Sequence, residues 1–334
     1  MNSTELKKIF DSFNKLKVLI VGDLMLDVYY WGDVSRISPE APVPIVAVSK
    51  KESRMGGAGN VAINIQAMGA TPILCSVIGN DTNGEKLVKI LKERKLPTEG
   101  ILVSKDRPTT TKTRIISNNH HIVRIDDETE EYIGDKQSKK LFEQIQKFIE
   151  AGKTDVIIFE DYDKGVISSA LIRNVIALAK KKNIATVVDP KKRNFTDYSE
   201  VTLFKPNLKE LKEGLKIDVQ AGDFKQVQSV TEQLRKNQKI ANVLVTLSEH
   251  GVFINSEKEK KLVPAHIRNI SDVSGAGDTV VSIAALCCAL NLPPVQVAFL
   301  SNLAGGQVCE KTGVVPVDKK QLLKEALSYM NENK

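Results

Sequence analysis

Cysteine is scarce in this sequence, and the few cysteines present match no metal or disulfide pattern. They are Cys75, Cys287, Cys288 and Cys309, which form no CxxC pair and share no spacing with the four histidines. The sequence therefore predicts neither a structural zinc site nor a disulfide framework, and no set of metal ligands is recognisable. A reducing compartment, the cytoplasm, is the expected location.

Long apolar runs are missing as well. The longest, Val280–Leu290, spans 11 residues and is followed by Asn291 and two prolines, whereas a helix needs about 20 apolar residues to cross a bilayer. The N-terminal residues 1–17 interleave charges with apolar residues and lack the apolar segment of a secretory signal. We expect neither a membrane span nor export.

Acidic residues do not balance the basic ones. The chain has 48 Lys and Arg against 41 Asp and Glu, a net charge of +7, which suits nucleic acid, an anionic membrane or small anionic substrates. The basic residues are scattered in pairs such as Lys7–Lys8, usually near acidic residues, and no aromatic platform for bases accompanies them. We therefore expect small anionic substrates and no nucleic-acid partner.

The sequence does have enough apolar residues, 42%, for a full core. Short β-rich runs alternate with segments of helical spacing. The runs are at 18–21, 73–78, 156–159, 186–188, 201–204 and 243–247, and the helical segments at 60–68, 85–91 and 170–181. This pattern predicts an α/β fold with a mostly parallel central sheet flanked by helices, and the final third is expected to be helical.

Two segments interrupt the alternation. Val28–Val48 is extended around three prolines, and Thr109–Ile125 alternates Thr and Ile, without a helix signal in either. We expect both to leave one edge of the sheet and pair as a small antiparallel β-sheet lid, inserted at about 27–48 and 109–126 into a single domain covering 1–334. Apolar lid residues predict a homodimer formed through the lid. They are Val28, Trp31, Val43, Ile45 and Val48.

The most specific motif is DVSGAGD at residues 272–278, which opens an apolar helix. Gly275 and Gly277 let a phosphate approach the backbone, and the free N–H groups of a first helical turn form an anion hole. Asp278 is placed to accept the proton of a hydroxyl that attacks a phosphoryl group. A helix-capping aspartate is the alternative, and the motif alone does not decide between the two.

Other motifs are less specific. MGGAGN at 55–60 suits a nucleotide loop or a sugar-binding turn, but no buried strand precedes it, so the dinucleotide fingerprint fails. Asp23 and Asp27 follow the first strand, where carboxylates suit sugar hydroxyls, although turn capping explains them equally well. Asn207 is explained by helix capping alone. Lys164 follows another strand and could reach a phosphate.

Together these motifs resemble those of the ribokinase-like (PfkB) carbohydrate kinases, from near residue 17 to near residue 320. The resemblance implies a three-layer ribokinase-like fold with a small β-sheet lid. Within the family, residues 21–27 and 32–46 are similar to kinases that act on D-glycero-β-D-manno-heptose 7-phosphate. Residues 116–126 and 188–191 support the same assignment.

The resemblance also implies roles for individual residues. Asp278 would be the catalytic base, and the anion hole would be formed by Gly275, Ala276 and Gly277. The residues implied at the nucleotide phosphates and their magnesium are Asn207 and Glu210, and those bordering the adenosine are Ser248, Gly251 and Asn302. The residues implied at the sugar hydroxyls are Asp23, Asp27, Gly57 and Asn60. Basic candidates for the distal phosphate are Lys164, Lys191 and Arg193.

The implied reaction is transfer of the ATP γ-phosphoryl group, with Mg²⁺, to the anomeric 1-hydroxyl of this heptose 7-phosphate, in the synthesis of ADP-heptose for the lipopolysaccharide inner core. In many bacteria such a kinase is fused to a nucleotidyltransferase that carries a His-x-Gly-His motif, which this sequence lacks. We therefore expect a stand-alone kinase. Another sugar or nucleoside kinase of the same family, or a non-catalytic sugar-sensing relative, remains open.

Overall fold

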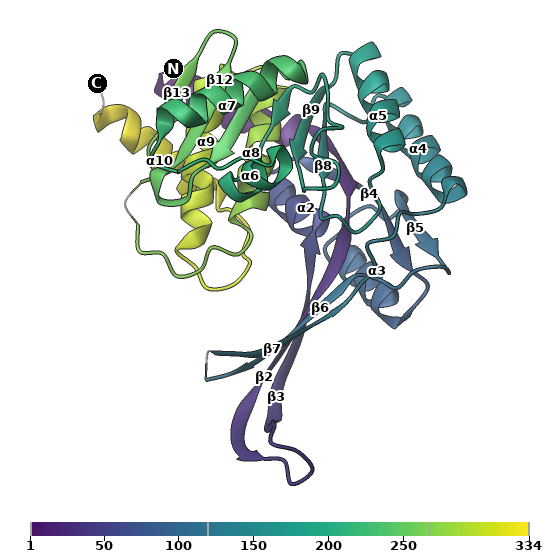
Figure 1. Cartoon of the computed structure of the whole chain (residues 1–334). Coiled ribbons are helices and arrows are strands. Elements are labelled where there is room, and N and C mark those ends of the chain that lie inside the picture. Colours follow the sequence, from purple (N-terminus) through teal and green to yellow (C-terminus); the bar gives the residue numbers. More distant parts are fainter. Residues whose placement is uncertain (1, 119, 267, 333–334) are drawn as a thin grey trace.

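The computed structural model describes residues 2–118, 120–266 and 268–332, and a sheet of nine strands forms its centre (Figure 1). The strand order is β13-β12-β11-β10-β9-β8-β1-β4-β5. Their bounds are β1 Lys17–Gly22, β4 Thr71–Gly79, β5 Ile101–Ser104, β8 Val156–Glu160, β9 Ala185–Asp189, β10 Leu203–Phe204, β11 Asn242–Thr246, β12 Val252–Ser256 and β13 Lys260–Val263. The seven neighbouring strands β11, β10, β9, β8, β1, β4 and β5 pair in parallel. Strand β12 pairs antiparallel with β11, and β13 pairs antiparallel with β12.

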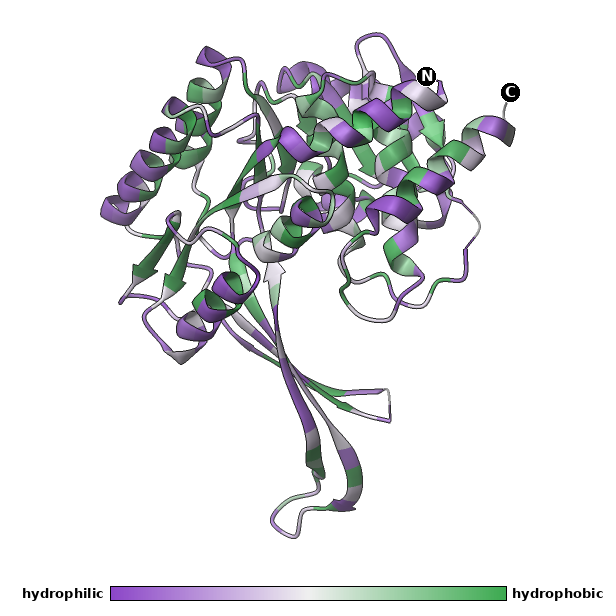
Figure 2. Cartoon of the chain, turned by 180° about the vertical axis from the view of Figure 1, so that it is seen from behind, coloured by the Kyte–Doolittle hydropathy of each residue, from purple (hydrophilic) through white to green (hydrophobic). Residues whose placement is uncertain are grey.

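Helices cover both faces of this sheet, and their outer sides are the more hydrophilic ones (Figure 2). One face carries α1 Ser3–Ser12, α2 Ala58–Ala67, α3 Thr82–Glu93, α8 Ala276–Ala289, α9 Pro294–Cys309 and α10 Lys319–Glu332. The other carries α4 Asp135–Glu150, α5 Ser169–Lys181, α6 Leu208–Leu215 and α7 Phe224–Asn237.

Strand β1 shows why the sheet needs helices on both sides. Val18 and Ile20 belong to one buried apolar cluster, and Leu19 and Val21 belong to the other, because successive strand residues point to opposite faces. A strand that is apolar on both faces is typical of a parallel sheet between two helical layers. The α/β fold expected from the sequence is confirmed.

The lid is a second sheet that projects from the body (Figure 1). Its strands are β2 Leu24–Ile37, β3 Pro44–Gly57, β6 Thr111–Ser117 and β7 His120–Asp127, in the order β3-β2-β6-β7. We expected antiparallel pairing throughout, but β2 and β6 run in parallel. The reason is that both leave the body after parallel strands of the main sheet, β1 and β5, and so run outward from its same edge.

Two other expectations need correction. The final third is not wholly helical, because β12 and β13 extend the main sheet there. Among the apolar lid residues expected at the surface, Val28 is buried and Trp31 and Ile45 are half-buried. Val43 and Val48 are exposed. No helix within the described ranges is long and apolar enough to cross a membrane.

Candidate active site

Three acidic residues converge at the carboxyl edge of the main sheet. Glu160 ends β8, Asp189 ends β9 directly beside it, and Asp278 lies in the first turn of α8. All three side chains are buried, and their carboxylate oxygens lie within 4.8 Å of one another. Burial and the neighbouring carboxylates Asp189 and Asp278 raise the pKa of Glu160 well above its usual range.

Asp278 is held by two hydrogen bonds from distant segments. The Asn60 side-chain amide donates to Oδ2 at 2.6 Å, and the Tyr162 hydroxyl donates to Oδ1 at 2.9 Å. Burial raises the pKa of Asp278 to about 6, against the lowering effect of the Asn60 hydrogen bond. The carboxyl group can therefore gain and lose a proton near neutral pH.

The backbone around Asp278 has the form expected of an anion hole. Gly275 caps α8 in the left-handed region, with φ of 78°, which favours glycine. A Cβ atom there would lie 2.8 Å from the Asn60 amide nitrogen, so the loop approaches α2 closely. The N–H group of Gly277, in the first turn of the 14-residue helix α8, has no acceptor within the helix, whereas that of Ala276 donates to the Val273 carbonyl at 3.2 Å.

Lysines partly neutralise this acidic edge. Lys205 is buried, and its Nζ lies 2.8 Å from Asp189 Oδ2. Burial alone would lower the pKa of Lys205, but the carboxylates of Asp189 and Glu210 raise it, so the ammonium group stays charged. Lys191 pairs with Glu210, and its Nζ lies over the Tyr162 ring, 5.1 Å from the ring centroid. The edge is thus an alternating set of carboxylates and ammonium groups.

Asn207 and Glu210 form a capping box at the start of α6. Asn207 Oδ1 accepts from the Glu210 N–H, and Glu210 Oε2 accepts from the Asn207 N–H, both at 2.8 Å. Helix capping, the simpler interpretation of Asn207, therefore holds in this structure. Glu210 also has a link to the acidic edge through Lys191.

The residues predicted at the sugar occupy two different environments. Asp23 is buried and accepts backbone N–H groups of Tyr162, Lys164 and Val166, at 2.8 to 3.2 Å. It therefore holds the loop that carries Tyr162. Asp27 lies on the lid strand β2 and pairs with Arg114 at 2.5 Å.

Gly56 and Gly57 directly precede α2, whose first turn contains Asn60, and Gly56 lies against the Asp27 side chain. A Cβ atom at Gly56 would clash with the Asp27 carboxylate. The predicted sugar residues Asp27, Gly57 and Asn60 therefore form a continuous path toward Asp278.

The residues predicted at the adenosine meet around one segment. Ser248 lies in a short turn, Gly251 directly precedes β12, and a Cβ atom on Gly251 would clash with the Val263 carbonyl. Asn302, on α9, donates to the Pro264 carbonyl at 2.8 Å. The structure therefore gathers Gly251 and Asn302 around residues 263–265.

The basic residues predicted at the distal phosphate are already paired with acidic groups. Lys164 Nζ lies 2.8 Å from Glu128 and 3.3 Å from Glu130, and Arg193 pairs with Glu130. Lys191, as noted above, pairs with Glu210.

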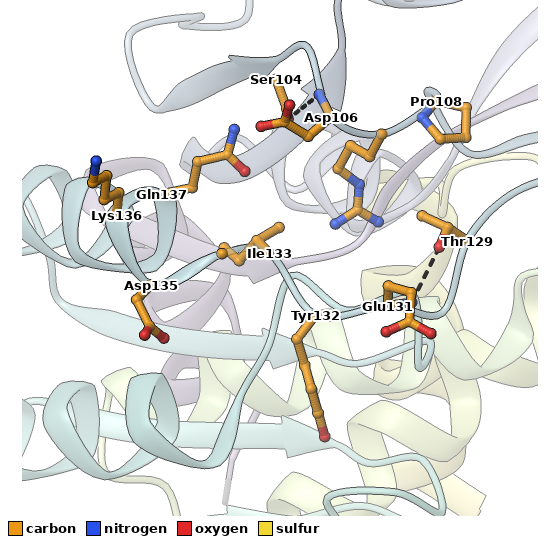
Figure 3. Close-up of a pocket in the computed structure, with 12 residues that line it drawn as sticks. Ser104, Asp106, Pro108, Thr129, Glu131, Tyr132, Ile133, Asp135, Lys136 and Gln137 are labelled. Carbon is orange, nitrogen blue, oxygen red and sulfur yellow. Dashed lines mark hydrogen bonds between the residues drawn. The ribbon is translucent and has the colours of Figure 1, made fainter.

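A cavity of about 500 Å³ lies elsewhere, between the chain around Arg107 and the start of α4 (Figure 3). Its lining includes Asp106, Thr129, Glu131, Tyr132 and Ile133, and none of the predicted site residues. Two lining residues contact predicted site residues: Arg107 donates to the Lys164 carbonyl, and the Arg193 guanidinium carbon lies 4.9 Å from the Tyr132 ring centroid. The cavity therefore does not replace the carboxyl edge as the candidate site.

Sequence reasoning missed Glu160, Tyr162 and Lys205 as site residues. Each had a usable signal, because Glu160 and Tyr162 end or follow a strand and Lys205 directly follows another. In an α/β sheet these are the positions that face a ligand. Asp189 appeared only within the VDPK motif at 188–191.

Known proteins match this chain over most of its length. Residues 15–320 match the family profile described as pfkB family carbohydrate kinase. The chain is 39% identical over 313 residues to the "Bifunctional protein HldE" of Sulfurimonas denitrificans, covering 93% of this chain and 64% of that protein. It is 38% identical over 299 residues to that of Helicobacter pylori, covering 89% and 63%. The chain thus spans less than two thirds of the length of these relatives.

Solved structures share the fold at low sequence identity. Phosphofructokinase-2 from Escherichia coli in complex with fructose-6-phosphate superposes with a TM-score of 0.75 at 18% identity, covering 95% of this chain and 99% of that one. Arabidopsis thaliana ribokinase complexed with ribose and ATP gives 0.71 at 15% identity, covering 92% and 99%. These likenesses show a ribokinase-like fold, and the resemblance drawn from the sequence motifs is confirmed.

Proposed function

The chain belongs to the pfkB family of carbohydrate kinases, and we propose that it transfers the γ-phosphoryl group of ATP to the anomeric 1-hydroxyl of D-glycero-β-D-manno-heptose 7-phosphate. The 1,7-bisphosphate formed would serve the synthesis of ADP-heptose, in the cytoplasm. The substrate assignment is supported by residues 21–27 and 32–46 and by the 38–39% identity to proteins named HldE.

The observation that carries the proposal is the placement of Asp278. Its carboxylate, with a pKa of about 6, lies in the first turn of α8 beside the Gly277 N–H group, which has no acceptor within the helix. A base and an anion hole on one helical turn suit phosphoryl transfer to a hydroxyl group.

The proposed step is a direct displacement. Asp278 takes the proton of the sugar 1-hydroxyl, the sugar oxygen bonds to the γ-phosphorus, and the bond from that phosphorus to the β,γ-bridging oxygen breaks, releasing ADP. The N–H group of Gly277 and the ammonium group of Lys205 would stabilise the charge on the phosphoryl oxygens, and the N–H group of Ala276 would join them by leaving the Val273 carbonyl. Positioning and charge stabilisation supply most of the rate enhancement in such reactions.

Two carboxylates beside the base fit a hard divalent cation. Both oxygens of Glu160 and Oδ1 of Asp189 are buried and have no hydrogen-bond partner among the described residues. Carboxylate oxygens are the protein ligands that Mg²⁺ prefers. We propose that Glu160, Asp189 and Glu210 face the Mg²⁺ that accompanies ATP. When bound, Mg²⁺ would neutralise charge on the phosphate oxygens.

The remaining site residues keep proposed binding roles. Asn207 would lie at the nucleotide phosphates, and Ser248, Gly251 and Asn302 at the adenosine, which the shared contacts around residues 263–265 support. Asp27, Gly57 and Asn60 would hold the sugar hydroxyls, with Asp23 fixing the adjacent loop. Lys191 and Lys164 are proposed near a phosphate, together with Arg193.

We also propose a homodimer formed through the lid. Several apolar lid side chains are more than one third exposed, and an exposed apolar sheet face favours association. They are Val34, Ile37, Val43, Val48, Ile122, Val123 and Ile125. Light scattering at micromolar concentration should give the mass of two chains. A monomeric mass would count against this proposal.

The experiment that tests the activity measures ADP release with Mg-ATP and a panel of acceptors. The panel contains heptose 7-phosphate, unphosphorylated heptose, fructose 6-phosphate, ribose and adenosine. We expect selective turnover of heptose 7-phosphate. If another acceptor is preferred, the kinase assignment stands and the substrate assignment fails. If ATP binds but no acceptor reacts, the substrate assignment fails, and an acceptor outside the panel or a sugar-sensing role replaces it.

A further inference from the structure

We propose that the lid carries the binding site for the distal phosphate of the sugar, built by Arg54 and Arg114 around the ring of Tyr29. This inference rests on the proposed function, because it names the residues that recognise the phosphate of a phosphorylated sugar. Neither arginine was singled out by the sequence.

Strand register places the two arginines on one face of the lid, beside Asp27, whose carboxylate is a proposed sugar ligand. Arg54 on β3 pairs with Asp27 on β2, and Arg114 on β6 pairs with Tyr29. Their guanidinium carbons lie 5.2 and 5.3 Å from the centroid of the Tyr29 ring. Each arginine has a carboxylate partner, Glu52 for Arg54 and Asp27 for Arg114, and a phosphate bound between the two guanidinium groups would share them with these carboxylates.

Both guanidinium groups have donors to spare. Arg114 donates twice from Nη1, to Asp27 Oδ1 at 2.5 Å and to the Lys112 carbonyl at 3.4 Å. Arg54 donates from Nε to Glu52 and from Nη1 to the Val314 carbonyl. Within the described residues, Nη2 of each arginine therefore has no acceptor. The side chains are 20% and 31% exposed, so a ligand can reach them, and guanidinium groups bind phosphate oxygens in pairs.

Contacts connect the two arginines to the proposed catalytic base along the sugar-binding residues. Asp278 contacts Asn60, and a cavity of about 280 Å³ is lined by both Asn60 and Arg54. On the other side, Asp27 contacts Arg114. A sugar with its 1-hydroxyl at Asp278 and its middle hydroxyls at Asn60 and Asp27 would present its far end to the two arginines. That end of heptose 7-phosphate carries the phosphate.

The earlier candidates for this phosphate are less available. Lys164 and Arg193 face Glu128 and Glu130, and a phosphate there would have to displace these carboxylates or lie beside them. Both lid arginines also have a carboxylate partner, Glu52 for Arg54 and Asp27 for Arg114, whereas Lys164 faces two carboxylates. Of these partners, Asp27 is itself a proposed sugar ligand. Its negative charge would then be shared between the arginine and the sugar hydroxyls.

The test compares two substrates in matched variants. We would measure KM and kcat of wild type, Arg54→Gln and Arg114→Gln with heptose 7-phosphate and with unphosphorylated heptose. Each variant should raise KM for the phosphorylated sugar by about 10- to 100-fold, the loss of a charge-assisted hydrogen bond. KM for unphosphorylated heptose should change by much less. Arg114→Lys, which keeps the charge, should restore part of the preference.

Arg124→Gln is the matched control. Arg124 pairs with Arg114 in the register of β6 and β7, but it is 57% exposed and its guanidinium group binds Asp126. It should keep the wild-type preference for the phosphorylated sugar. If it loses that preference as much as Arg114→Gln, the effect is the general charge of the lid and the site is overturned.

Failure of this site differs from failure of the proposed function. If Arg114→Gln lowers the turnover of both sugars equally, the arginine only orders Asp27, and the phosphate site is wrong while the kinase stands. If wild type does not phosphorylate heptose 7-phosphate, the substrate assignment fails. The phosphate site is then read by calorimetric binding of inorganic phosphate. Binding lost in the variant that carries both glutamines supports the site, and unchanged binding overturns it.

Discussion

The central strands of the body and the outer strand β7 of the lid are opposite in character. All residues of β8 are buried, and β1 is buried after its first residue, whereas all eight residues of β7 in the lid are exposed. The body is therefore stabilised mainly by apolar burial on both faces of its sheet. The lid depends on cross-strand contacts and on what covers it. The body therefore provides most of the stability of the fold, and the exposed residues of the lid can change for ligand binding at little cost in stability.

The largest expected effect tests this contrast directly. Ile158→Ala, in the core of β8, removes a fully buried side chain and should lower the free energy of unfolding by about 2–5 kcal/mol. Val123→Ala, on β7 of the lid, removes a half-exposed side chain and should change it by less than about 0.5 kcal/mol. Urea unfolding measures both. Equal losses would show that the lid is part of the cooperative core.

Asp278→Asn tests the chemistry that the body supports. We expect turnover to fall at least about 100-fold, the lower range for a positioned general base, with ATP binding retained. Burial raises the pKa of Asp278 to about 6 in the folded chain, so its ionised form destabilises the protein, and that cost is fully present above pH 6. The variant should therefore melt at a higher temperature at pH 8. Near-normal turnover would rule out Asp278 as the base.

The pH dependence gives a third test. Because Asp278 must be ionised to accept a proton, kcat/KM should fall about tenfold per unit below pH 6 and level off above it. The Tyr162 hydroxyl lowers the pKa of Asp278 by donating to it. In Tyr162→Phe the acid limb should therefore move to higher pH, while the ring still contacts Lys191. An unchanged pH profile in this variant would mean that the ionisation of another group causes the fall in kcat/KM at low pH.

The smallest effect on folding is expected at the tip of the lid. Ile37→Glu replaces an exposed apolar side chain on β2, far from the buried core, so the melting temperature of the monomer should hardly change. If the lid forms the dimer, a buried unpaired carboxylate at that interface should raise the dimer dissociation constant at least tenfold. Analytical ultracentrifugation measures this constant. An unaffected dimer would place the interface elsewhere.

Local sequence patterns predicted much of the body. The four apolar residues Val18–Val21 indicated a central parallel strand, and the glycines before Asp278 indicated a loop that opens a helix, because both signals lie within a few consecutive residues. The hairpin of β12 and β13 was missed because β13 carries three charged or half-buried residues and lacks an apolar run. The lid was expected at 27–48 and 109–126, whereas its strands lie within 24–57 and 111–127, and the parallel pairing of β2 with β6 was not expected.

The contacts of the site were beyond sequence patterns for a physical reason. Asn60 and Asp278 are 218 residues apart, and Tyr162 and Asp278 are 116 apart. Residue types show which groups can bind a proton or a phosphate, but only the packing of α2 and α8 shows which groups meet. Arg54 and Arg114 looked like ordinary charged residues of a solvated strand until the register placed them around Tyr29.

Strand β2 runs unbroken for 14 residues, from Leu24 beside the site to Ile37 at the lid tip, about 45 Å at the usual rise of a strand. One strand therefore carries a proposed substrate contact near its start and the proposed subunit contact near its end. Linkage then makes the two reciprocal: whatever affinity for the sugar phosphate is gained from the second subunit, the second subunit gains equally from the sugar phosphate. The specific activity of the enzyme would then depend on its concentration. It would fall when dilution dissociates the dimer, and it would recover with excess sugar phosphate.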